Sequence, residues 1–169
     1  MADVTIEATD FETVFMANMW RSTVADGAQQ LSAALQSEIP VEPNRFIERD
    51  GRIAACLSPG RYLILADAGT LYERVREQCD PELISMVQLD HSREAFRLEG
   101  QQAAKLLMKG VAIDLDETRF PVGSLFQSSI HDIGLTALKR GSSSFDLLVY
   151  NSFADSFCHW LFDAAMEFS

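Results

Sequence analysis

The histidines are the first candidates for catalysis, because each has a chain neighbour that could act with it as a catalytic pair. A hydrolytic triad needs a nucleophile, a base and a carboxylate, and its serine commonly stands on a Gly-x-Ser-x-Gly turn, which this sequence lacks. Adjacent residues point to opposite faces of a strand, or about 100° apart on a helix. We therefore expect packing roles and no catalytic residue, while a small hydrolase using His91 or His131 remains an alternative. The three pairs are Asp90-His91, His131-Asp132 and Cys158-His159.

Acidic residues and cysteines are the candidates for a metal site. Asp114, Asp116 and Glu117 lie close together and could bind a divalent cation, but the ligand series of a calcium-binding loop is absent, so a solvated loop is expected. The cysteines are far apart and form no Cys-x-x-Cys motif, which argues against a zinc site or a disulfide framework. We predict no metal ligands in this chain. The thiols expected to be free and buried are Cys56, Cys79 and Cys158.

Cofactor phosphates and nucleic acids are both disfavoured as ligands. No two of the nine glycines are closer than seven positions apart, so the clustered glycines of a dinucleotide fold or a P-loop are missing. The net charge of −11 repels polyanions and anionic membranes, and the only adjacent basic pair is Lys139-Arg140. The N-terminus shows no signal peptide, which would have a basic patch followed by an apolar run. No run of about 18 apolar residues, as a transmembrane helix needs, is visible either, so we expect a cytoplasmic protein.

Residues 1–45 differ from the rest of the chain and are predicted to form an N-terminal arm. A short strand is expected over residues 4–8, and a helix should open at the Thr23 capping box and end before Pro40 and Pro43. Between them lies an aromatic and methionine segment of helical or near-helical spacing, which either packs into the core or docks on another subunit. Its large residues are Phe11, Phe15, Met16, Met19 and Trp20.

Residues 46–169 are predicted to form one α+β domain, in which a mainly antiparallel sheet carries helices packed on it. Strands are expected at residues 61–65, 83–89, 95–98, 124–131, 133–139 and 145–150. Capping boxes at Thr70 and Ser152 should open two helices, a short helix should follow Gly100, and residues 113–123 should form a loop. An apolar stripe predicts that the last helix docks on the sheet. The stripe comprises Phe153, Phe157, Trp160, Leu161, Ala164, Ala165 and Phe168.

Several ordered motifs make residues 52–168 resemble the gamma subunit family of heterotetrameric sarcosine oxidase. The most specific is Lys109-Gly-Val-Ala-Ile-Asp-Leu115 followed by Phe120-Pro-Val-Gly123. The family's pattern differs at Ser58, Gln101 and Asn151, where it has Gly, Pro and Arg. The other motifs are Leu57-Ser-Pro-Gly-Arg-Tyr-Leu63, Val87-Gln-Leu-Asp-His-Ser92, Phe96-Arg-Leu-Glu-Gly100, Ala103-Ala-Lys-Leu-Leu107, Tyr150-Asn-Ser-Phe-Ala154 and Trp160-Leu161.

The resemblance implies a fold like the folate-binding domain of aminomethyltransferases and a structural, non-catalytic role without a cofactor in this chain. It implies larger alpha and beta subunits that carry FAD, FMN, NAD and the tetrahydrofolate site, and a small delta subunit that carries zinc. The implied complex oxidatively demethylates sarcosine or a related N-methyl amine and passes the one-carbon unit to tetrahydrofolate. The alternative is a stand-alone folate- or pterin-binding module, for which Asp90 and Glu99 are the candidate acidic residues.

Overall fold

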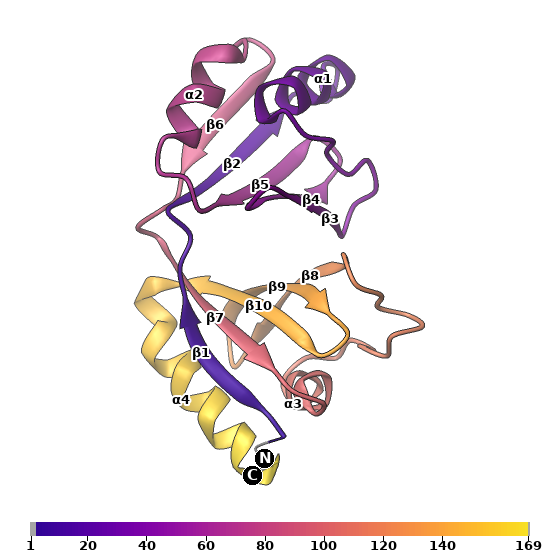
Figure 1. Ribbon diagram of the computed structural model, residues 1–169, viewed down its shortest axis with the longest axis vertical. Coiled ribbons are helices and arrows are strands. Elements are labelled where there is room, and N and C mark those ends of the chain that lie inside the picture. Colours follow the sequence, from indigo (N-terminus) through magenta and orange to yellow (C-terminus); the bar gives the residue numbers. More distant parts are fainter. Residues whose placement is uncertain (1–2, 169) are drawn as a thin grey trace. The chain divides into compact units, whose positions relative to one another are not determined.

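Two antiparallel sheets with helices packed on them make up the computed structural model, which describes residues 3–168 (Figure 1). Within this range each sheet has five strands. The chain divides into two compact units: unit 1 combines Met1–Asp10 with His91–Ser169, and unit 2 is Phe11–Asp90. The predicted α+β class with antiparallel pairing is confirmed. The contacts, however, divide the chain after residues 10 and 90, whereas the sequence suggested a boundary after residue 45.

Unit 2 is built around β2, which pairs antiparallel with β5 on one side and β6 on the other. The strand order is β3-β4-β5-β2-β6. The strands are β2 (Thr13–Met19), β3 (Arg45–Arg49), β4 (Arg52–Ser58), β5 (Arg61–Ala66) and β6 (Ile84–Gln88), and the helices are α1 (Val24–Leu35) and α2 (Leu71–Gln78).

The core of unit 2 lies between this sheet and its two helices. Alternate residues of β5, such as Ile64, face the helices, and they meet Leu31 of α1 and Val75 of α2, all with no exposed surface. Burying a side chain of this size contributes roughly 1.5–3 kcal/mol, so a few such residues hold the helices on the sheet. Phe15 of β2 packs edge-on against the ring of Tyr72, with the centroids 5.5 Å apart.

The large residues from Phe11 to Trp20 recur at helical or near-helical spacing, but the segment is not a helix. Its residues Thr13–Met19 form β2, in which Phe15 opposes Ile64 of β5 and also Gln88 of β6. Paired on both sides, the strand satisfies its backbone groups in the sheet, and side-chain spacing alone did not reveal these distant partners.

The hairpin of β3 and β4 was not predicted from the sequence. Its turn is Asp50-Gly51, and both residues have left-handed backbone angles, with φ of 50° and 71°. An Asp-Gly pair in this conformation is a strong hairpin signal, because a two-residue turn of this kind matches the twist of the flanking strands.

Unit 1 places β1 and β8 at the edges of a second sheet, with strand order β1-β7-β10-β9-β8. All its described pairings are antiparallel. The expected strand at residues 4–8, the hairpins near the C-terminus and the loop at residues 113–123 are all confirmed. The elements are β1 (Thr5–Thr9), β7 (Arg93–Glu99), α3 (Ala103–Met108), β8 (Leu125–Ile130), β9 (Ile133–Gly141), β10 (Ser144–Tyr150) and α4 (Ala154–Ala165).

Helices α3 and α4 cover one face of this sheet. The stripe predicted for the last helix is confirmed for Phe157, Leu161 and Ala164, which lie in the core of unit 1. Phe153 was wrongly included: it belongs to a 3₁₀ turn before α4 and is 47% exposed.

The three predicted capping boxes mark helix starts but do not form their hydrogen bonds. Helices begin directly after Thr23 and Thr70, yet neither hydroxyl caps its helix, and Thr23 Oγ1 donates instead to the carbonyl of Trp20 (3.2 Å). Ser152 lies in the 3₁₀ turn, so Phe153 occupies the cap position of α4. Among residues 3–168, no helix combines the length and apolar character needed to cross a membrane.

Candidate functional site

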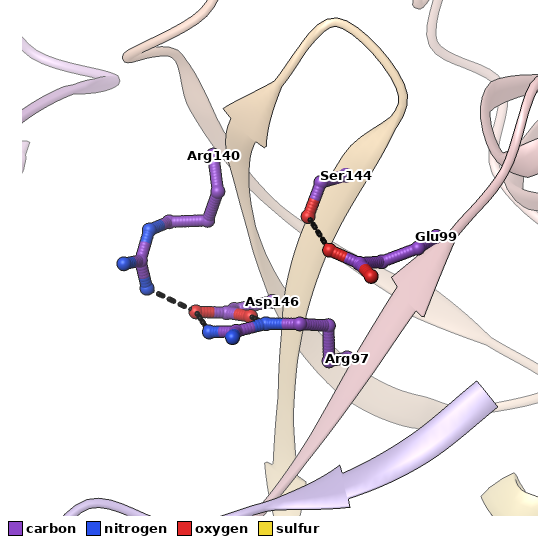
Figure 2. Close-up of polar contacts among 5 residues, drawn as sticks. All are labelled: Arg97, Glu99, Arg140, Ser144 and Asp146. Carbon is purple, nitrogen blue, oxygen red and sulfur yellow. Dashed lines mark hydrogen bonds and ion pairs between the residues drawn. The ribbon is translucent and has the colours of Figure 1, made fainter. Parts of the chain in front are cut away.

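The most prominent polar cluster of unit 1 centres on Asp146 in β10 (Figure 2). Asp146 pairs in register with Arg97 of β7, whose Nε and Nη2 donate to the two carboxylate oxygens at 2.8 and 3.1 Å. Arg140 of β9 approaches from the other side, and its Nη1 also donates to the Asp146 carboxylate. The three side chains therefore link the three central strands of the sheet.

Electrostatics suit this cluster to a structural role. The side chain of Asp146 has no exposed surface, while those of Arg97 and Arg140 are 35% and 18% exposed. A buried carboxylate needs compensating charge, and guanidinium groups remain protonated at all ordinary pH values. Both oxygens of this fully buried carboxylate accept hydrogen bonds from guanidinium groups, so the geometry favours cross-strand stabilisation over contact with a substrate proton.

Sequence reasoning missed this cluster. The available signal was Asp146 inside the otherwise apolar run Phe145-Asp-Leu-Leu-Val149, because a charge within a buried strand requires a partner. The positions of Arg97 and Arg140 across the sheet depend on strand order, which sequence spacing does not give.

The two acidic residues named for a pterin site lie in different units and both interact with protein donors. Asp90 of unit 2 accepts the backbone N–H of Val14 at 2.6 Å and the amide of Gln88 at 2.5 Å. Glu99 of unit 1 accepts the hydroxyl of Ser144 at 2.9 Å, as Figure 2 shows. Both carboxylates thus contribute to local structure at strand ends.

The acidic loop at residues 114–117 is organised by internal hydrogen bonds. Asp114 accepts the N–H of Asp116 at 3.1 Å and pairs with Arg119 at 3.4 Å. The hydroxyl and N–H of Thr118 donate to Asp116 and hold the pKa of that carboxyl below its usual value. Over residues 3–168, no three His, Cys, Asp or Glu side chains are grouped so as to hold a metal ion.

A buried cation lies behind this loop. Lys139 is 1% exposed, and its Nζ donates to the carbonyl of Phe120 at 2.8 Å and lies 5.8 Å from the ring centroid of Phe145. Lys139 therefore ties the end of the loop to β9 and β10.

The three histidines have different surroundings. His131 occupies a left-handed turn (φ 47°), and its ring meets the edge of Trp160 with the centroids 6.4 Å apart. The carbonyl of His91 accepts the side-chain amide of Asn151 at 2.9 Å, and His159 is exposed on α4. The described contacts thus assign His131 and His91 to turn packing and strand-end structure.

The cysteines are all free. Cys56 and Cys79 are buried, as expected, and burial raises the pKa of both thiols. Cys158 differs from the expectation because it is partly exposed on α4. A raised pKa lowers the thiolate fraction and therefore the reactivity of the two buried thiols.

The segment from Phe11 to Trp20 was considered for core packing or for docking on another subunit, and its residues differ in burial. Phe11 and Phe15 are buried, Met16 and Met19 are half-buried, and Trp20 is 60% exposed. Core packing thus accounts for the strand itself, and Trp20 directly after the strand is the exposed member of the segment.

Comparisons with known proteins agree with the motifs. The family model described as "Sarcosine oxidase, gamma subunit family" matches residues 21–167, and so extends into the N-terminal segment. The sarcosine oxidase subunit gamma of Corynebacterium sp. (strain U-96) is 29% identical over 120 residues, which are 70% of this chain and 58% of that protein. The corresponding subunit of Arthrobacter sp is 26% identical over 145 residues, 85% of this chain and 71% of that one. The match to the Corynebacterium protein therefore spans less than two thirds of its length.

Two solved structures share the fold. A chain of the heterotetrameric sarcosine oxidase from Corynebacterium sp. U-96, in complex with pyrrole 2-carboxylate, has a TM-score of 0.87 at 27% identity, covering 98% of this chain and 85% of that chain. The glycine cleavage system aminomethyltransferase T from Bartonella henselae has a TM-score of 0.66 at 16% identity, covering 95% of this chain and 45% of that one. The expected likeness to the aminomethyltransferase fold is thereby confirmed.

Proposed function

Because the chain belongs to the sarcosine oxidase gamma subunit family, we propose that it is a structural, non-catalytic subunit of a heterotetrameric sarcosine oxidase. The observation that carries this proposal is the likeness, over 98% of this chain, to a chain of a heterotetrameric sarcosine oxidase. The TM-score of 0.87 over that length shows that this chain and that subunit share the same fold.

The proposed partners are larger alpha and beta subunits and a small delta subunit in the cytoplasm. In this proposal those subunits bind FAD, FMN, NAD, tetrahydrofolate and zinc. The complex would oxidise sarcosine or a related N-methyl amine and transfer the one-carbon unit to tetrahydrofolate. The present chain would supply none of the reacting groups.

The polar contacts of the chain support a structural role. The buried carboxylate of Asp146 is neutralised by two guanidinium groups, and Asp90 accepts two protein hydrogen bonds. These are the environments of groups that hold strands together, since a general base needs access to a substrate proton.

Co-expression tests the proposal directly. This chain would be produced with the alpha, beta and delta subunits of the same organism, with an affinity tag on alpha only. We expect this chain in stoichiometric amount in the purified complex, together with bound flavin and sarcosine-dependent peroxide formation. Its absence from a complex that contains the other three subunits would contradict the proposal.

The isolated chain provides the second measurement. We expect it to bind neither flavin nor tetrahydrofolate, which absorbance and isothermal titration calorimetry would check. Saturable binding of tetrahydrofolate to the isolated chain would favour the alternative of a stand-alone folate-binding module. An Asp90→Asn variant would then show whether that carboxylate takes part.

A further inference from the structure

Two grooves flank the turn between β2 and α1 in unit 2. The first has a volume of about 340 Å³ and includes Trp20, Arg76, Ile84 and Met86 in its wall. The second has a volume of about 560 Å³ and is lined by residues from the β2–α1 turn and α1, from the segment before β3, and from the turn between β4 and β5 with the start of β5. Its lining includes Arg21, Val24, Ile39, Val41, Pro59 and Tyr62.

The most exposed apolar side chains of unit 2 belong to these grooves. Trp20 is 60% exposed and Val41 is 87% exposed. Tryptophan and arginine are the residue types that most often dominate the energy of protein interfaces, especially where they border a pocket. The grooves therefore have the composition of an interface centre.

The residues that line the grooves carry charge of one sign, although exposed acidic residues such as Asp26, Glu42 and Glu82 are their neighbours in the chain. Arg76 in the first groove and Arg21 in the second are the charged residues among those that line them. The whole chain carries 25 acidic and 14 basic residues, so a lining whose charges are all positive stands apart from the rest of the molecule. Arg21 also lies just before the N-terminus of the twelve-residue helix α1, whose first turn carries the exposed Asp26.

We propose that the two grooves receive a segment of a partner subunit that bears large apolar side chains flanked by Asp or Glu. This inference rests on the proposed function, because it needs the partner subunits. The apolar side chains enter the grooves on either side of Trp20, and the carboxylates face Arg21 and Arg76. Complementary charge of this kind sets the orientation and the association rate, while the aromatic anchor supplies most of the affinity.

A second copy of this chain fits the grooves less well. A two-fold symmetric contact brings the same patch of each copy together, so arginine would face arginine. Each copy also carries a net charge of −11, which opposes association at long range. A partner whose net charge is not strongly negative, and which has a locally acidic segment to face the arginines, avoids both penalties.

Competition during assembly tests the proposal. Wild-type chain and a variant, distinguished by a small mass label, would be co-expressed in excess over tagged alpha, beta and delta subunits, and their ratio in the complex measured by mass spectrometry. We expect Trp20→Ala to be disfavoured at least about 30-fold, as for an interface hot spot, and Arg21→Glu about tenfold or more. Because both side chains are exposed, urea unfolding of the isolated variants should match wild type.

Matched controls come from unit 1. Phe162→Ala removes an aromatic side chain that is 53% exposed on α4, and Lys105→Glu reverses an exposed charge on α3. Both controls should compete equally with wild type. If Trp20→Ala and Arg21→Glu also compete equally, the inference is wrong while the proposed function stands. If wild-type chain itself is missing from the complex, the proposed function fails first.

A photo-reactive amino acid at position 21 would identify the occupant. The expected cross-link joins a partner-subunit peptide that contains Leu, Phe, Met or Trp next to Asp or Glu. A cross-link to a basic segment, or to a second copy of this chain with matching dimer formation in analytical ultracentrifugation, would overturn the proposal.

Discussion

Arg97 donates two hydrogen bonds to the buried carboxylate of Asp146, from Nε to Oδ1 at 2.8 Å and from Nη2 to Oδ2 at 3.1 Å. The two residues face each other in register on β7 and β10, so the ion pair coincides with the pairing of these strands (Figure 2). Bidentate pairs fix geometry as well as charge. The pair thus helps to specify how the central strands of unit 1 align.

Replacing Asp146 with Ala should destabilise unit 1 by about 2–4 kcal/mol, because the change leaves two guanidinium groups without their carboxylate in a largely buried site. The partial exposure of Arg97 lets water offset part of this cost. The measurement is the free energy of unfolding in urea. Asp114→Ala is the control, since its ion pair with Arg119 is exposed and its loss should cost less than about 1 kcal/mol. Equal effects of the two changes would contradict the structural role of the cluster.

Gly100→Ala should also destabilise unit 1. Gly100 has a φ of 131°, and a Cβ at this position would lie 2.1 Å from the carbonyl oxygen of Asp3. The backbone conformation alone costs roughly 1–3 kcal/mol for a residue with a side chain, and the clash would push the segment before β1 away. Faster proteolysis near the N-terminus and a lower urea midpoint would be the readouts.

Gly69→Ala is the matched control for Gly100. Gly69 has no left-handed backbone angle, and its nearest neighbour, Glu12 Oε2, would lie at an ordinary 3.5 Å from an added Cβ. We expect its unfolding midpoint to stay close to that of wild type. A Gly100→Ala protein as stable as Gly69→Ala would show that the segment around Asp3 does not need this close approach.

Much of the fold follows from local patterns in the sequence. The helix stripe of Phe157 and Leu161 and the strand Arg61–Ala66 were predictable, because spacing and turn residues encode them within a short window. The segment before Trp20 was not, since β2 depends on strands that are distant in the chain. Tertiary pairing overrides local spacing in such cases.

The candidate sites were harder to predict than the fold. The Asp146 cluster draws on three strands whose order no local signal specifies, so only the need of a buried acid for a partner could be foreseen. The grooves beside Trp20 likewise join α1, α2 and the segment before β3. The density of large apolar residues up to Trp20 pointed to docking as one option. Which of them are buried depends on the pairing of β2 with β5 and β6, and Trp20 lies beyond the end of that strand.

Tyr62 should make the protein sensitive to alkaline pH. Burial raises the pKa of its phenol from 10.0 to about 12, so the folded protein keeps a proton that the unfolded chain loses above about pH 10. The free energy of unfolding should therefore fall as the pH rises from about 10 towards 12. Tyr62→Phe should remove this part of the pH dependence, measured as the difference between the two proteins in urea unfolding across the range.

At neutral pH the same variant reports on one hydrogen bond. Tyr62 Oη donates to the carbonyl of Pro40 at 3.1 Å in a buried site, so Tyr62→Phe should cost about 1 kcal/mol. An unchanged slope between wild type and Tyr62→Phe above pH 10 would contradict the buried, protonated phenol.

Asp90 should prove structural rather than ligand-binding. Its carboxylate accepts the N–H of Val14, whose carbonyl accepts the N–H of Leu89. Both backbone groups of Val14, near the start of β2, are therefore hydrogen-bonded to the segment that follows β6. Asp90→Ala removes the acceptor for both Val14 and Gln88 and should lower the free energy of unfolding by about 1–2 kcal/mol. Asp90→Asn keeps one carbonyl oxygen for Val14, so it should cost less than half as much. If both variants unfold like wild type while the complex loses tetrahydrofolate-dependent activity, Asp90 would instead belong to a ligand site, because a residue that only supports the sheet would affect stability first.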